Sequence, residues 1–203
     1  MRPITFTRSQ PNASATSVAA KQVLNTTAVT ISNGTLTVPA YPTVTADSNA
    51  SGVVFAVVGT NPAGWDQSAN ITFAAPSGTV TASVSFATVT SVTASAATSA
   101  TISVGNAQSG YTAWIPLDIY TPNQVTTISG TTAGTVSYSV EYTNEDPFDT
   151  TISQQAVAHP VATLTNASGN VTAFTTTLMR AIRLVINSGG GSVRFTAVQQ
   201  STK

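Results

Sequence analysis

GTVSYSVEY, the stretch Gly134–Tyr142, decides the fold class of this chain. Apolar or aromatic side chains alternate strictly with small polar ones along it, and this period of two predicts a β-strand with one buried face. The β-branched and aromatic content agrees with that interpretation. The side chains expected on the buried face are Val136, Tyr138, Val140 and Tyr142.

The same pattern recurs along the chain. Gly78–Ala87 alternates in the same way, and further short strands are expected at Ile4–Thr7, Val53–Val58, Ile71–Ala74, Thr88–Ala94, Thr101–Val104 and Gln124–Ser129. Many short strands separated by turn signals are typical of sandwiches and barrels. We therefore expect an all-β chain built as antiparallel β-sandwiches, Ig-like or jelly-roll-like.

Two hairpins and one helix are predicted from local signals. Asn33–Gly34 supplies the two positive φ angles of a type I′ turn between apolar runs. The glycine-rich Asn187–Ser192 is expected to be the loop of a closing hairpin, whose arms are residues 182–186 and 193–197. Ser14–Leu24 fits a short helix with a serine cap, the one helix that the pattern allows.

The length of 203 residues fits one large β domain or two small sandwiches. A polar stretch at Asn106–Gly110 favours the second arrangement. The expected organisation is an N-terminal arm at residues 1–12, a first sandwich at 13–108, and a second β domain at 109–203 that ends in the hairpin. The arm is expected to add a strand to a neighbouring subunit.

Charge is scarce. Only 7% of the residues are charged and the net charge is +0, whereas about 25% is usual in soluble domains. Serine, threonine and amide groups must then solvate the surface, and such a surface costs little to desolvate because no ion leaves water. This composition favours a protein docked against neighbours, although a merely neutral Thr/Ser-rich β protein has the same composition.

The residue content argues against several functional classes. Seven basic residues are too few for nucleic-acid binding, no apolar run is long enough for a membrane span, and the start of the chain has no apolar segment of a secretory signal. The single histidine, His159, and one acidic stretch at Glu145–Asp149 give no catalytic set, and the stretch lacks the spacing of a calcium loop. We expect no enzyme, no metal and no cofactor.

The remaining candidates are interface residues. Trp65 lies on a turn, where an exposed aromatic side chain can anchor a contact. Three arginines gather near the C-terminus and are expected to pair with Glu141, Glu145, Asp146 or Asp149, or with a neighbouring subunit. The interface candidates are Arg2, Arg8, Trp65, Arg180, Arg183 and Arg194.

The order of several short motifs resembles that of a known group of proteins. These motifs, which span nearly the whole chain, are Gly52–Asn61, Gly78–Val80, Phe86–Thr93, Trp114–Leu117, Asp146–Phe148, Ala181–Leu184, Asn187–Gly189 and Val198–Gln200. The chain is similar to small β-rich virion structural proteins encoded among the head and tail genes of tailed bacteriophages. The resemblance implies a virion component assembled in the host cytoplasm, and it transfers no catalytic residue.

This context sets the expected function. The first expectation is a capsid decoration (cement) protein, a homo-oligomer on the outside of the head whose partner is the major capsid protein. A neck or tail protein is the alternative, and a receptor- or carbohydrate-binding module with Trp65, Tyr111 and Tyr120 as ligand platforms is a third. Neither nucleic acid nor membrane is expected as a partner.

Overall fold

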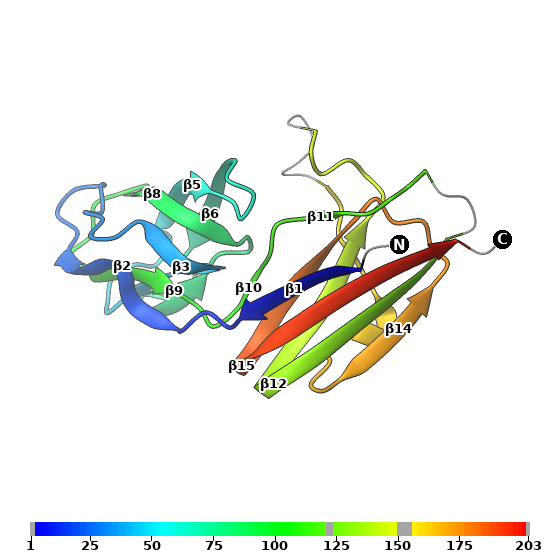
Figure 1. The fold of residues 1–203 in the computed structure, drawn as a ribbon. Coiled ribbons are helices and arrows are strands. Elements are labelled where there is room, and N and C mark those ends of the chain that lie inside the picture. The colour runs from blue at the N-terminus through cyan, green and yellow to red at the C-terminus, as the bar shows by residue number, and fades with distance from the viewer. Residues whose placement is uncertain (1–2, 121–123, 150–155, 202–203) are drawn as a thin grey trace. The chain divides into compact units, whose positions relative to one another are not determined.

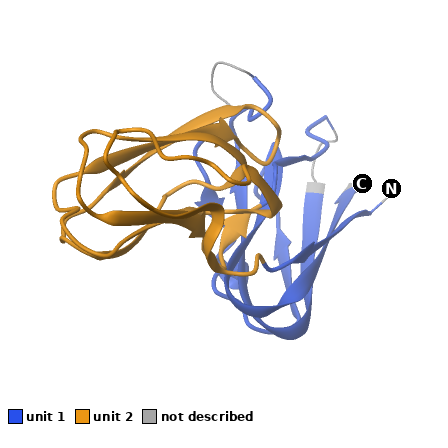
Figure 2. Ribbon diagram, turned by 90° about the vertical axis from the view of Figure 1, so that its left-hand side faces the viewer, with its two compact units in different colours: residues 1–10, 112–203 blue, residues 11–111 orange. Residues whose placement is uncertain are grey.

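A computed structural model describes residues 3–120, 124–149 and 156–201. Apart from one 3₁₀ turn, η1 (Ala162–Leu164), its regular elements are strands, so the expected all-β sandwich class is confirmed. The chain divides into two compact units (Figure 2). Unit 1 comprises residues 1–10 and 112–203, and unit 2 comprises residues 11–111.

Unit 2 is a sandwich of two four-stranded antiparallel sheets. One sheet has the order β2-β9-β4-β7 and the other β3-β8-β5-β6. The strands are β2 (Ser14–Val23), β3 (Thr35–Ala40), β4 (Pro42–Ala46), β5 (Val54–Thr60), β6 (Asp66–Thr72), β7 (Gly78–Thr81), β8 (Phe86–Ala94) and β9 (Thr101–Asn106), and β10 (Gly110–Tyr111) follows them. Among the eight strands of the two sheets, β2 pairs with β9, β3 with β8, β4 with β7 and β5 with β6. This nested pairing is the topology of an eight-stranded jelly roll.

The core of unit 2 lies between its two sheets. Phe55 and Phe86 from one sheet and Val44 and Ile102 from the other are fully buried. Phe55 also meets Phe73 edge to face, with ring centroids 5.6 Å apart, a favoured geometry for aromatic pairs. On β4 and β7, for example, Val44 faces the core while Thr45 and Thr79 carry their hydroxyls on the outer face of the sheet.

Unit 1 is built around two very long strands. The strands are β1 (Ile4–Ser9), β11 (Ile115–Pro116), β12 (Gln124–Thr143), β13 (His159–Pro160), β14 (Val171–Thr175) and β15 (Ala181–Ser201). β12 and β15 pair along almost their whole length, from Gln124 opposite Ser201 to Thr143 opposite Ala181, with one bulge at Ser137/Tyr138. Figure 1 shows that this two-stranded ribbon bends back on itself, which produces two layers.

The bend is demonstrated by a contact within one strand. An ideal Cβ on Gly130 would lie 2.2 Å from the hydroxyl of Tyr138. These residues would be about 26 Å apart in a straight strand at roughly 3.3 Å per residue, so the two halves of β12 must face each other. Tyr138 is fully buried between the layers, and its hydroxyl donates a hydrogen bond to the Gly169 carbonyl at 3.1 Å. Burial raises the pKa of the Tyr138 phenol.

Glycine makes the corner possible. Gly134 on β12 has φ +80° and Gly189 on β15 has φ +106°, a region that other residues avoid because of their Cβ. A Cβ on Gly189 would also lie 2.4 Å from the carbonyl oxygen of Thr135 on the paired strand. Both strands therefore turn at the same place while their pairing continues.

The two layers of unit 1 repeat the nested order of unit 2. One layer, which we call the front layer, has the strand order β1, second half of β15, first half of β12, β14. The rear layer runs β11, the first half of β15, the second half of β12, then β13. Unit 1 thus has jelly-roll topology as well, and unit 2 is inserted between its first strand, β1, and the rest of it.

The N-terminal segment differs from the expected free arm. Residues 4–9 form β1, which pairs with Ser192–Ala197 of β15 in the same chain, and Ile4 packs against the core of unit 1. The division also departs from the expected boundaries of 13–108 and 109–203, because the N-terminal strand belongs with the C-terminal unit. Sequence proximity gives no signal for such a pairing.

The helix predicted at Ser14–Leu24 is wrong. This segment is strand β2, paired with β9 through an irregular register. A helix of this length is marginal in isolation, and here Val18 and Ala19 are both fully buried in the sandwich. Pairing and burial in the sheet therefore outweigh a weak local preference.

Both predicted hairpins are wrong as well. Neither Asn33 nor Gly34 has a positive φ. The Asn33 side chain instead accepts a hydrogen bond from the Thr35 amide at 3.1 Å, and β3 pairs with β8. The closing hairpin is absent because residues 182–186 and 193–197 each pair with β12. Their apolar side chains do share one core, as the sequence pattern indicated, because the ribbon is folded.

Candidate interaction surfaces

The predicted interface residues occupy different environments. Arg2 lies outside the described residues. Arg8 is only 5% exposed, because it lies on the core-facing side of β1 with Ile4. Trp65 is partly exposed on the turn before β6, where its amide donates to the Asn61 side chain at 3.1 Å. Arg194 is exposed on the outer face of the front layer.

Arg183 is held within unit 1. It stands directly opposite Glu141 in the β12–β15 ladder, and its Nε and terminal nitrogen both approach Glu141 Oε2 at 2.7 Å. Its guanidinium carbon lies 4.5 Å from the ring centroid of Trp114, which is a cation–π geometry. The pairing of this arginine within the chain, rather than with a neighbour, was one of the two expectations for it.

Arg180 and the acidic stretch form a second internal contact. The Arg180 guanidinium pairs with Asp146 Oδ2, and the other oxygen of Asp146 accepts the Phe148 amide at 3.0 Å. Glu145 accepts the Val157 amide at 2.8 Å. These carboxylates therefore stabilise their own turn. In the described ranges, no three histidine, aspartate or glutamate side chains gather as metal ligands would.

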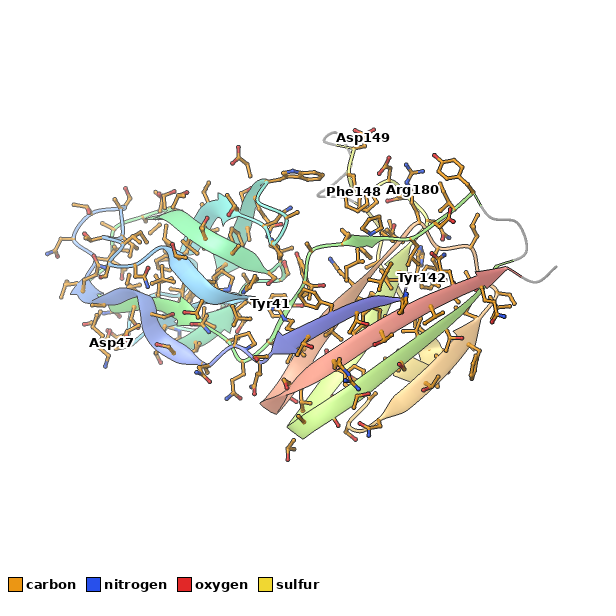
Figure 3. All side chains as sticks on the ribbon, viewed as in Figure 1. Tyr41, Asp47, Tyr142, Phe148, Asp149 and Arg180 are labelled. Carbon is orange, nitrogen blue, oxygen red and sulfur yellow. The ribbon has the colours of Figure 1, made fainter. Side chains whose placement is uncertain are left out.

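The same end of unit 1 exposes apolar side chains. Phe148, Asp149 and Arg180 lie together there (Figure 3), and Leu178 is two residues from Arg180. Val157 also lies at this end, because its amide donates a hydrogen bond to the Glu145 carboxylate. The exposed fractions are 41% for Phe148, 50% for Val157 and 64% for Leu178.

The front layer of unit 1 presents a broad outer face of hydroxyl groups. One row crosses all four strands through Thr5, Thr196, Ser129 and Thr172, which the strand registers place side by side. The hydroxyls of Thr5 and Thr196 lie 3.4 Å apart. We call the outer side of this layer the hydroxyl face. Among the described residues of its strand ladder, Arg194 is the one charged side chain that it carries.

Unit 2 contains a shallow groove of about 370 Å³ on the outer face of one sheet. Its floor consists of two cross-strand threonine pairs, Thr43 with Thr81 and Thr45 with Thr79, and the second pair is hydrogen-bonded at 2.8 Å. The segment 13–15 forms one wall. This wall crosses so close to β9 that a Cβ on Gly105 would lie 1.7 Å from the Ser14 carbonyl oxygen.

The wall of the groove is held by one buried amide. Asn106 is 8% exposed, and its side chain donates to the Asn12 carbonyl and accepts from the Ser17 hydroxyl, both at 2.7 Å. Sequence reasoning missed both Asn106 and the groove. The alternating threonines of β4 and β7 were a usable signal for the floor, whereas nothing in the sequence placed β4 beside β7.

The single histidine of the chain, His159, lies on the short strand β13. His159 is exposed, and its ring lies 5.3 Å from that of Tyr142, its cross-strand neighbour, in a tilted contact. This contact does not place an acid, a base and a nucleophile around one point, as catalysis requires. In the part of the chain that the structure describes, no helix has the length and apolar character needed to cross a membrane.

The fold and the hydroxyl face together define a class: an all-β protein of two jelly rolls, one inserted in the chain of the other, with a hydroxyl-rich, charge-poor outer face on unit 1. Comparison with known proteins adds no relative, since no family model, no curated protein and no solved structure matches the chain.

Proposed function

We propose that this chain is a non-enzymatic structural protein of a bacteriophage virion, and specifically a decoration protein bound to the outside of the capsid. The observation that carries the proposal is the hydroxyl face. Its central row of Thr5, Thr196, Ser129 and Thr172 offers hydrogen-bonding groups and contains no ion that would have to be desolvated. The centres of protein interfaces are likewise depleted of charge.

Two further points support the proposal. Jelly rolls are a recurrent architecture of viral capsid proteins, although lectins and cupins share it, so topology alone does not assign a function. The order of motifs from Gly52–Asn61 to Val198–Gln200 resembles that of tailed-phage virion proteins. The partners proposed are the major capsid protein and further copies of this chain.

Copy number tests the position on the particle. Quantitative mass spectrometry of purified virions should give on the order of hundreds of copies, because a decoration protein follows the symmetry of the shell. About six, twelve or eighteen copies would instead place the protein at the neck or tail. Absence from purified virions would refute the virion assignment altogether.

A carbohydrate-binding module is the second candidate, favoured by the threonine-lined groove of unit 2. Of the three aromatic side chains expected to serve as platforms, Tyr120 is 91% exposed in unit 1, whereas Tyr111 meets Tyr41 in unit 2 with ring centroids 5.9 Å apart. None of the three lines the groove. Binding on a glycan array that is lost on Thr45→Val would establish this function, and a silent array would remove it.

A further inference from the structure

The edge strand β14 differs from the other sheet edges of this protein. It spans Val171–Thr175 and, in the described part of the chain, pairs with β12 on one side only. Figure 1 shows it at the margin of its layer. An edge strand presents unpaired amide and carbonyl groups to any second strand, so proteins normally protect edges with charge, proline, bulges or short length.

The other described edges carry such protection. They are β1 with Arg8, β2 with Lys21 and two register shifts, β3 with Pro39 and a register shift, β6 with Asp66, the four-residue β7, and the two-residue β11 and β13 with Pro116 and Pro160. In contrast, β14 has the sequence VTAFT and an unbroken register with β12. It also exposes 73% of Phe174.

We infer that β14 pairs with β14 of a second copy of this chain, antiparallel about a twofold axis at Ala173. In this register Phe174 of each copy stands opposite Thr172 of the other, on the outer face, and Val171 stands opposite Thr175. Cross-strand pairs of an aromatic with a β-branched residue are favourable. The strand is self-complementary, as a twofold interface requires.

A second copy fits this edge because nothing repels it. No residue of β14 is charged, so the twofold axis brings no like charges together. The charged residue of the hydroxyl face, Arg194, lies opposite Thr131 in the β12–β15 ladder. It is therefore separated from β14 by strand β12. Pairing would join two four-stranded front layers into one continuous sheet and extend the hydroxyl face across both copies. The purified protein should pair in this way without any other virion component.

Engineered disulfides test the register. The chain has no cysteine, so Thr172→Cys and Phe174→Cys each introduce a single thiol on an exposed side chain. An equimolar mixture of the two variants should form a covalent dimer about tenfold faster than either variant alone. Opposite residues lie about 4.5–5.5 Å apart, within disulfide range, whereas identical residues are diagonal neighbours about 7–8 Å apart. Equal or faster cross-linking of a single variant would refute the register.

Charge introduced at this edge tests the pairing itself. Thr172→Lys/Phe174→Lys places lysines opposite one another across the axis and should weaken self-association by about tenfold or more in sedimentation velocity. Thr5→Lys/Thr7→Lys on the opposite edge, β1, is the matched control and should associate as the wild type does. A wild type that stays monomeric at every concentration, or a β14 variant that associates as well as the wild type, would refute the inference. Both substituted side chains of β14 are exposed, so the variant should stay folded. An unchanged circular dichroism spectrum would confirm this.

Discussion

Substituting Gly130 by alanine should destabilise unit 1 selectively. The new Cβ would lie 2.2 Å from the Tyr138 hydroxyl and 2.5 Å from Cζ, so the ring must move. Tyr138 is fully buried and bonded to the Gly169 carbonyl. Overpacking costs roughly 1–3 kcal/mol and unpaired buried groups roughly 1–3 kcal/mol. Alanine regains roughly 0.5–1 kcal/mol of chain entropy, which leaves a loss of about 3 kcal/mol in the free energy of unfolding.

The two tryptophans allow each unit to be followed separately. Trp65 belongs to unit 2 and Trp114 to unit 1. In a Trp65→Phe background, urea unfolding monitored by fluorescence reports unit 1 alone. Gly169→Ala is the matched control, since its Cβ would meet nothing within 4 Å, and it should leave the midpoint unchanged.

A double-mutant cycle then identifies the cause. Tyr138→Val removes the ring that the new Cβ meets, so Gly130→Ala should cost less in that background, with a coupling free energy of at least about 1 kcal/mol. If Gly130→Ala shifts unit 1 by less than about 0.5 kcal/mol, or if the two substitutions are simply additive, the folded-ribbon description of unit 1 is incorrect.

Four other outcomes are expected. Gly105→Ala should lower the stability of unit 2 by about 2 kcal/mol, because its Cβ meets the Ser14 carbonyl at 1.7 Å; an unchanged Trp65 transition would contradict this. Glu141→Gln and Arg183→Gln should show a coupling of about 1 kcal/mol in a double-mutant cycle on unit 1, and a coupling near zero would mean that the pair is only geometric. The bond from the Thr101 amide holds the pKa of Asp47 below its usual value. Its stabilising effect is therefore complete above the unfolded-state pKa and is lost as the pH falls through the lower folded value, so Asp47→Asn should flatten the acid dependence of the unit 2 midpoint. Deleting residues 1–9 should make unit 1 protease-sensitive, because β1 pairs with β15, whereas a free arm would be lost without effect.

The strands were predictable from the sequence where one face of a strand is buried. The alternation of Val136, Tyr138 and Val140 gave both the strand and its core side correctly. Local reasoning failed at Ser14–Leu24 and at Asn187–Ser192, since the conformation of both segments depends on partners far along the chain. Glycines in a row read as a loop, and only the pairing with β12 shows that they form a corner.

The candidate surfaces, too, were predictable from the sequence only in part. Composition predicted a charge-poor exterior, and the charged residues Glu141 and Asp146 were already suspected partners for the arginines. The hydroxyl face was not predictable, because its central row combines residues from four separate strands. The burial of Arg8 was hidden for the same reason, since the face of an isolated short strand is ambiguous until its neighbour is known.

The insertion of unit 2 behind β1 has a consequence for biosynthesis. Thr5 and Thr196, which lie side by side in the finished sheet, are 191 residues apart in the chain. At translation rates of about 5–20 residues per second, β1 emerges on the order of ten to forty seconds before its partner. Unit 2 is complete on the ribosome during that interval, whereas the nascent β1 waits as an unpaired edge. Chaperone binding or premature pairing therefore has its largest effect at this strand. A chain that is terminated late in translation would contain a folded unit 2 and an incomplete unit 1.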